Sequence, residues 1–297
     1  MHTDIKQGAD TLRTDGITRG RLVAAALPLA ALVAYYHDVA VQLGVRWWND
    51  PNYSHGFFVP MFSLYFLWER RRDIAKVPVR WSALGVPVML AAAGLRMFGH
   101  LIFSPYIAGM SLVVMLAGAV IFCFGLRLTR QLWLPIAFLV LMLPLPTPAY
   151  EAVALPLQRF AAIFATRVLH TVGIPVLREG NVIHFAGKSL EVAQACSGMR
   201  LLIGFVAMGI AVAHLSKRPI WHKSLLVAST FPIAIVANAV RVAGTGILYN
   251  TMGEAAAEGF FHAFSGWLLF VIALGLLALE SFALSFLFAP RNTDKRQ

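Results

Sequence analysis

Charged residues are scarce in this chain: Asp, Glu, Lys and Arg make up only 13% of its 297 residues, whereas soluble proteins average about 25%. Hydrophobic residues make up 59%, and the mean hydropathy is +0.70. A soluble domain cannot hide that much apolar surface in one core, so a soluble globular enzyme is excluded. Disordered chains are rich in charge and poor in aromatic residues, so disorder is excluded too. We therefore expect a multi-pass membrane protein.

Cysteine is also scarce, since the chain contains only Cys123 and Cys196. Two cysteines are too few for a disulfide framework or for a multi-cysteine metal site. The nine histidines show no spacing typical of metal ligands. We therefore expect no metal and no cofactor.

Acidic residues are outnumbered by basic ones, 14 against 25, which gives a net charge of +11. In a soluble protein this excess would suggest nucleic acid as a partner. In a membrane protein, Lys and Arg collect instead in the cytoplasmic loops. With the N-terminus inside, 17 of the 25 basic residues fall in inner segments and five in outer ones. This dispersed pattern leaves no basic domain for nucleic acid.

The fold class that we expect is an all-α polytopic membrane protein in which 1–297 form a single integral membrane domain. A membrane-spanning helix needs about 20 apolar residues. Eight apolar segments predict spans at about 22–37, 53–68, 82–99, 103–125, 132–146, 197–215, 223–248 and 260–289. An even number of spans places both termini, 1–21 and 290–297, in the cytoplasm.

The segment 147–196 is the one long connection predicted on the outer side. Its residues 151–172 have an amphipathic pattern, which we interpret as a helix lying at the outer membrane surface. A buried helix of the bundle is the alternative and fits about as well. Residues 176–192 alternate β-prone and polar positions around Gly180-Asn181 and Gly187. This pattern predicts a small hairpin that leads the chain to Cys196.

Three consecutive spans each contribute one reactive or cationic residue near the predicted outer side: Cys196, Arg241 and His262. Ionisable residues within membrane spans are costly and mark functional sites. A nearby His or Arg lowers the pKa of a thiol, and a Cys–His pair can attack an acyl carbon. Arg241 can stabilise an oxyanion or hold a carboxylate. No metal is needed for this chemistry.

Other residues fit supporting roles in the same site. Ser197 follows the cysteine where a helix begins, and free backbone N–H groups there favour a thiolate or an oxyanion. Asn238 lies on the same helical face as Arg241, where it could orient His262 or the substrate. Arg200 lies one turn after the cysteine.

Structural interpretations of these residues remain open. A membrane cysteine is usually a small hydrophobic residue, which is our reading of Cys123. Arg241 fits a side chain that reaches from a span end towards the interface. Arg200 could pair with Glu191 or face a cavity. His55 fits a polar helix start or a residue near the substrate.

Three short segments together resemble the signatures of the exosortase/archaeosortase family: ACSGMR at 195–200, NAVR at 238–241 and FHAFSGW at 261–267. Residues 35–71 also resemble the N-terminal part of bacterial exosortases. The resemblance covers nearly the whole chain. It implies that Cys196, Arg241 and His262 are catalytic, and the histidine is similar to the bacterial form.

The resemblance further implies a cysteine peptidase or transpeptidase of the bacterial inner membrane, with its active site on the periplasmic side. Its substrates would be exported proteins that end in a Pro-Glu-Pro motif, a transmembrane helix and a basic tail, and it would be linked to exopolysaccharide or biofilm production. The alternative is a non-enzymatic transporter or scaffold of exopolysaccharide export, with Arg200 and Arg241 lining a path for anionic sugar.

Overall fold

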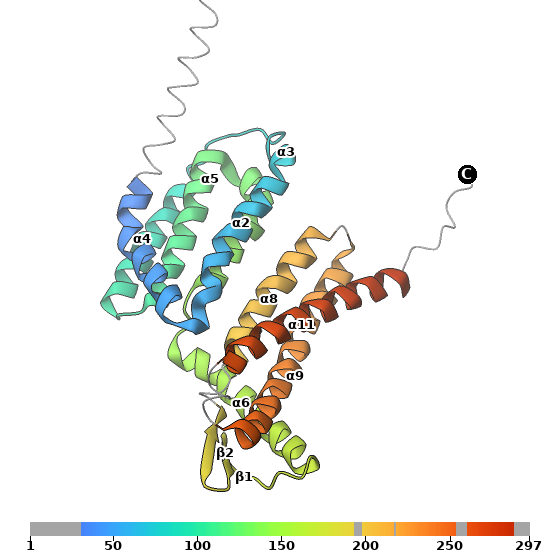
Figure 1. Ribbon diagram of the computed structural model, residues 1–297. Coiled ribbons are helices and arrows are strands. Elements are labelled where there is room, and N and C mark those ends of the chain that lie inside the picture. The colour runs from blue at the N-terminus through green and yellow to red at the C-terminus, as the bar shows by residue number, and fades with distance from the viewer. Residues whose placement is uncertain (1–30, 193–197, 217, 254–259, 288–297) are drawn as a thin grey trace, which may run out of the picture. The chain divides into compact units, whose positions relative to one another are not determined.

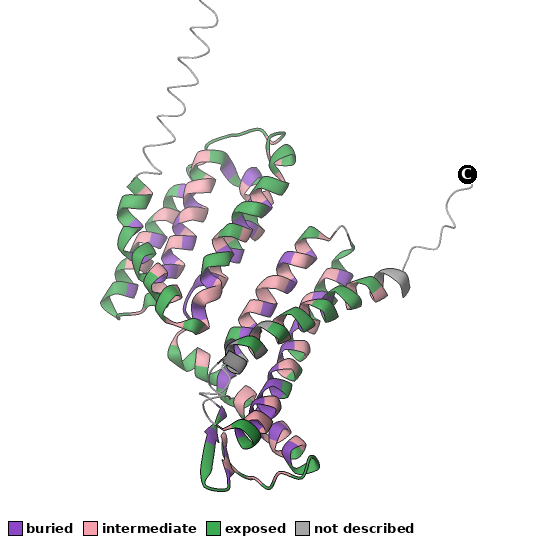
Figure 2. Cartoon of the chain, in the orientation of Figure 1, coloured by how far each residue is buried: buried purple, intermediate pink, exposed green. Residues whose placement is uncertain are grey.

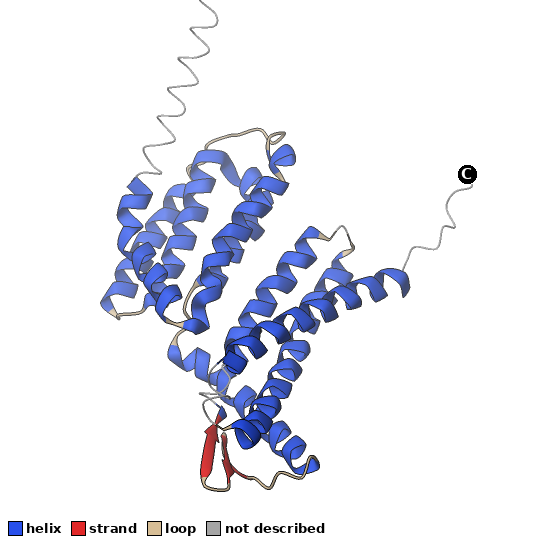
Figure 3. Ribbon diagram, in the orientation of Figure 1, coloured by secondary structure: helices blue, strands red, loops and turns tan. Residues whose placement is uncertain are grey.

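The computed structural model describes residues 31–192, 198–216, 218–253 and 260–287. Helices dominate these residues, and one small sheet follows α6 (Figures 1 and 3). The described residues divide into two compact units. Unit 1 runs up to Asn49 and resumes over Pro60–Pro144, and unit 2 comprises Asp50–Val59 and the residues from Leu145 onward.

Unit 1 is a helical bundle. It contains the helix over residues 31–49, most of α2 (Phe58–Glu69), α3 (Arg71–Ile74), α4 (Gly85–Leu101), α5 (Pro105–Phe138) and the 3-10 helix η2 (Leu139–Met142). The first helix continues well past residue 37, where we expected its span to end. Its buried Tyr36, Val39 and Leu43 follow helical spacing, so the buried stripe extends into the predicted loop.

Gly125 divides α5 into two arms. Its φ is +82°, and the carbonyl oxygen of Arg80 occupies the space that a side chain would need. The second arm returns alongside the first. The Leu143 side chain, which follows the second arm and η2, lies against Gly109 of the first arm. Our expected fourth and fifth spans fall on these arms. We were wrong about a loop at 126–131: a single residue of positive φ makes the reversal, so the chain stays helical through Arg127 and Arg130.

Polar contacts tie the helices of unit 1 together. The Tyr36 hydroxyl donates to Ser111 Oγ over 3.2 Å. Arg96, one of the three basic residues within predicted spans, pairs with Asp38 at 2.8 Å and lies 4.0 Å from the centre of the Tyr35 ring. The carboxylate of Asp38 and the Tyr35 ring therefore account for a charged residue within this predicted span.

Unit 2 carries every candidate site residue that the structure describes. It contains η1 (Pro51–Phe57), α6 (Thr147–Thr171), the sheet, α8 (Gly198–Leu215), α9 (Ile220–Met252) and α11 (Phe260–Leu287). Apolar side chains from four helices form a shared core: Ala154 of α6; Met199, Leu201, Leu202 and Phe205 of α8; Ala234 of α9; Ala273 and Leu277 of α11. The helices that bear the candidate residues are therefore packed neighbours.

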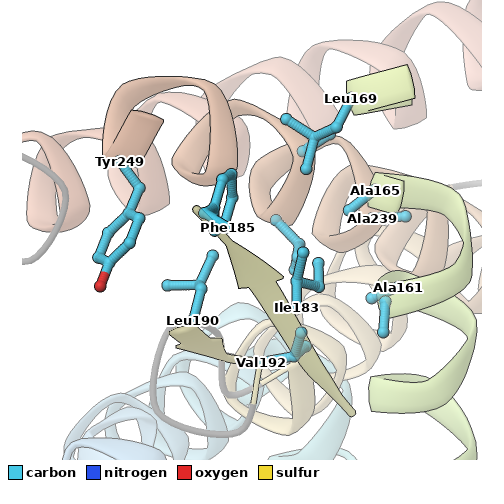
Figure 4. Close-up of a cluster of buried hydrophobic side chains, with 12 residues drawn as sticks. Ala161, Ala165, Leu169, Ile183, Phe185, Leu190, Val192, Ala239 and Tyr249 are labelled. Atoms are coloured by element: carbon cyan, nitrogen blue, oxygen red, sulfur yellow. The ribbon is translucent and has the colours of Figure 1, made fainter. Parts of the chain in front are cut away.

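Helix α6 packs on α9 through small residues. Ala161, Ala162, Ala165 and Leu169 are at most 1% exposed and belong to one cluster with residues of α9 and the sheet (Figure 4). This packing favours the alternative interpretation, a bundle helix, over the surface helix that we expected. The helix is also long and apolar enough to cross a membrane.

The predicted hairpin is confirmed and gains one strand. The strands β1 (Leu177–Glu179), β2 (Val182–Phe185) and β3 (Lys188–Glu191) form an antiparallel sheet in sequence order. Both turns use glycine at positive φ, with +60° at Gly180 and +78° at Gly187. The side chains of Ile183, Phe185 and Leu190 point into the cluster drawn in Figure 4.

The outer surfaces of the helices are strongly apolar, as lipid contact requires. Figure 2 shows exposed positions along the helices. Many of the exposed side chains are hydrophobic: Leu90, Met97 and Phe282, for example, are each more than 65% exposed. In the described part of the chain, three helices meet the length and hydropathy of a membrane span: Pro105–Met142, Thr147–Thr171 and Ile220–Met252. Three shorter apolar helices cover Gly85–Leu101, Met199–Leu215 and Leu268–Leu284. The chain is thus a polytopic membrane protein, and the count of eight spans and the side of the termini stay predictions.

Candidate active site

The site residues predicted from sequence fall on the helices of unit 2 or directly before one of them. Arg200 lies at the start of α8, Asn238 and Arg241 lie on α9, and His262 is the third residue of α11. Cys196 and Ser197 lie outside the described residues, and the helix α8 begins at Gly198. The His262 side chain is likewise not described, so its place is taken from its helical position.

Helix α9 concentrates buried polar side chains. Seven polar or charged residues of the described chain are classed as buried, and five of them lie on this helix: His222, Thr230, Asn238, Arg241 and Thr245. At about 100° per residue, the last four fall within about 80° of the helical circumference. A polar stripe on the inner face of an apolar helix is typical of a functional site inside a membrane protein.

Arg241 contacts the helix that carries His262. The side chain of Arg241 is buried, and its guanidinium lies against Gly266 of α11, 3.3 Å from Nη2 to the point where a Cβ would stand. Gly266 follows His262 by one helical turn, so the two positions share a face of α11. The structure therefore brings the Arg241 guanidinium within one turn of position 262.

Asn238 lies one turn from Arg241 along the same buried face of α9. It is 4% exposed, and its Oδ1 accepts no hydrogen bond from the described part of the chain. A buried amide oxygen costs free energy when it has no donor, so this atom is a candidate acceptor for a substrate N–H.

Arg200 lies in a different environment from Arg241. It is exposed at the start of α8, and η1 packs against this helix. Tyr150, at the start of α6, lies within electrostatic range of both Arg200 and Asp50, the residue that caps η1. The packing of η1 against α8 places η1, which contains His55, beside the helix that begins just after Cys196. His55 lies next to Tyr53, with 6.4 Å between the ring centres.

The sheet holds the chain close to Cys196. Val192 is fully buried, and its N–H donates to the carbonyl of Asn181 over 3.0 Å. The hydroxyl of Tyr249, on α9, donates to the carbonyl of Ser189 over 3.2 Å. On the other side of the cysteine, Met199 is 3% exposed within the helical core. Packed residues therefore stand a few positions before and after the predicted nucleophile.

Sequence reasoning missed two features of the α9–α11 pair. Gly266 was not singled out, although it lies in one of the quoted motifs. Glu280, the only acidic residue of α11, accepts a hydrogen bond from Ser229 of α9 at 2.5 Å, and Ser281 Oγ lies 3.5 Å from His222 Nε2. A lone carboxylate in an apolar span is the signal that marks Glu280 in sequence. No group of three or more potential metal ligands occurs within the described ranges.

The family model of the transmembrane exosortases (Exosortase_EpsH) matches residues 47–279 of this chain, which is well over half of its length. The chain belongs to the transmembrane exosortase family. The match covers η1 and the helices α8 and α9, and it includes the part of α11 that holds His262 and Gly266. No curated protein and no solved structure matches the chain. Membership of the exosortase family makes this multi-pass membrane protein a member of a group of membrane-embedded sorting enzymes.

Proposed function

We propose that this exosortase is a cysteine peptidase and transpeptidase that cleaves exported proteins near a C-terminal sorting signal. The signal consists of a Pro-Glu-Pro motif, a transmembrane helix and a basic tail, and the work is linked to exopolysaccharide or biofilm production. The observation that carries the proposal is the contact of the buried Arg241 guanidinium with α11, one turn from His262. This contact lies in a bundle whose helix α8 begins two residues after Cys196.

In the first step, the thiolate of Cys196 attacks the carbonyl carbon of the scissile peptide bond. A C–S bond forms, the C–N bond breaks, and His262 gives a proton to the leaving amine. Arg241 stabilises the oxyanion of the tetrahedral intermediate or holds the carboxylate of the motif. Asn238, Ser197 and Arg200 support the site by binding the substrate.

In the second step, the amine of an acceptor, or water, attacks the thioester carbonyl. The new C–N or C–O bond forms, the C–S bond breaks, and Cys196 leaves as a thiolate while His262 accepts the proton of the nucleophile. The first step thus separates the exported protein from its own membrane anchor, and the second step releases it from Cys196. We place this chemistry at the periplasmic face of the inner membrane, level with the outer ends of α9 and α11.

The test uses both cysteines of the chain. Cys196→Ala should abolish processing of a tagged protein that ends in the sorting signal, because the nucleophile is lost. The matched control is Cys123→Ala, since Cys123 lies half-buried in α5 of unit 1 and has no proposed role. Processing is followed by the mobility of the tagged substrate on gels, at equal levels of each variant in the membrane.

Two outcomes count against the proposal. If Cys196→Ala still processed the substrate fully, Cys196 could not be the nucleophile. The transporter or scaffold would instead be supported by two results together. Neutralising Arg200 and Arg241 would abolish exopolysaccharide export, and Cys196→Ala would have no effect.

A further inference from the structure

We propose that Gly266 is a positioning residue of this site: because it has no side chain, the Arg241 guanidinium can lie directly against the backbone of α11. The inference rests on the proposed function, since Gly266 acts only through Arg241. It adds a residue that neither touches the substrate nor titrates, and whose contribution is the space it leaves.

The contact involves the whole head group of Arg241. From the point where a Cβ of residue 266 would stand, the distances are 3.3 Å to Nη2, 3.4 Å to Cζ and 3.6 Å to Nη1. Side chains rarely place a Cβ as close as 3.3 Å to another heavy atom. A methyl group at position 266 would therefore push the guanidinium away from α11 by a few tenths of an ångström, or force the two helices apart.

Backbone conformation does not explain the glycine. Gly266 is absent from the described glycines with positive φ, so an L-residue fits its backbone. Glycine is also, after proline, the least favourable residue in a helix interior. Gly275 on the same helix provides the comparison, because a Cβ there would meet nothing within 4 Å. The guanidinium is thus the feature that distinguishes position 266 from position 275.

Placement of the guanidinium matters because an arginine side chain is long and has many rotamers. Arg241 is only 9% exposed, and the α11 backbone at Gly266 limits where its head group can lie. His262 is one turn away on the same face of α11. A shift of about 1 Å in a reacting geometry can cost on the order of a hundredfold in rate. Gly266 therefore helps to fix where the Arg241 guanidinium lies on the face of α11 that carries position 262.

The first experiment compares Gly266→Ala with Gly275→Ala in the full-length protein in membranes, with the tagged substrate described above. We expect Gly266→Ala to lower the turnover number by roughly tenfold with a smaller change in KM, because a displacement of a few tenths of an ångström acts on the reacting geometry. Gly275→Ala should stay within about twofold of the unmodified protein. Equal rates for the two variants would overturn the inference.

The second experiment does not depend on activity. The melting temperature in detergent is measured for Gly266→Ala and Gly275→Ala, each with Arg241 present and with Arg241→Ala. Alanine favours a helix over glycine, so Gly275→Ala should raise the melting temperature in both backgrounds. Gly266→Ala should lower it when Arg241 is present and raise it when residue 241 is alanine.

This reversal of sign separates a contact with Arg241 from a general packing defect. If Gly266→Ala changes the melting temperature equally in the two backgrounds, Gly266 does not act through Arg241 and the inference is wrong. Full processing by Arg241→Ala would instead refute the role of Arg241 in the proposed function. The melting temperatures would still report whether the contact exists.

Discussion

A guanidinium inside an apolar helical bundle needs compensation, because desolvating a charge is costly. Arg241 is held on a polar stripe of α9 that includes Asn238 and Thr245, and its head group lies beside Gly266 of α11. Its planar fork can present two parallel N–H donors to a carboxylate, or several to an oxyanion, whereas lysine offers a single point charge. At the scale of the residue, geometry as well as charge should therefore decide activity.

Arg241→Lys should lower the rate of processing by about a hundredfold, because removing one oxyanion-stabilising donor costs roughly 10²–10³ in turnover. Arg241→Gln should lower the rate of processing further, because the positive charge is lost as well. Arg159→Lys is the matched control, since Arg159 is an exposed arginine of α6. Turnover and KM are measured separately with the tagged substrate. A lysine variant as active as the control would show that charge alone is sufficient.

At the scale of the elements, the sheet packs against the helix α9 and so anchors the chain shortly before Cys196. β2 and β3 bury Ile183, Phe185 and Leu190 against α6 and α9, and Val192 continues that core after the last strand. Gly246 of α9 gives room for this contact, because a Cβ there would lie 3.1 Å from Leu169 and 3.6 Å from Phe185. The nucleophile segment thus begins from a packed support.

Ile183→Ala should test that support. The side chain is fully buried, and truncating such a residue costs about 2–5 kcal/mol of unfolding free energy. We expect a lower melting temperature in detergent and slower processing by the variant that remains folded. Leu177→Ala, on the neighbouring strand, removes a 63% exposed side chain and should change the stability by less than about 0.5 kcal/mol. Equal melting temperatures for the two variants would contradict this role of the sheet.

At the scale of the whole molecule, topology determines on which side of the membrane the chemistry occurs. The loop charges predict that the segment 147–196 lies outside and that the segment around Arg70, Arg71 and Arg72 lies inside. The structure adds that Ala186, in the turn between β2 and β3, is exposed and that Arg72 of α3 is exposed as well. Both positions are therefore suitable for labelling from one side of the membrane.

In a protein without its native cysteines, Ala186→Cys should react with a membrane-impermeant maleimide applied to the periplasmic face. Arg72→Cys should react only after the membrane is permeabilised, because we expect its loop to be cytoplasmic. The measurement is the shift in mobility of the labelled protein. If only the Arg72→Cys protein were labelled in intact cells, the predicted topology would be inverted and the sheet would lie inside.

The sequence by itself determined the class of this protein and the residues worth testing. Its apolar runs, loop charges and turn glycines predict a polytopic helical protein with a small hairpin before Cys196, because hydropathy and turn propensity are local properties. Only the tertiary structure decided that one glycine at residue 125 replaces a loop, that α6 packs on α9, and that Gly266 and Glu280 meet residues of α9. Contacts between helices depend on rotation and register, which local pattern leaves undetermined, so the partner of Arg241 became visible only when α9 and α11 were side by side.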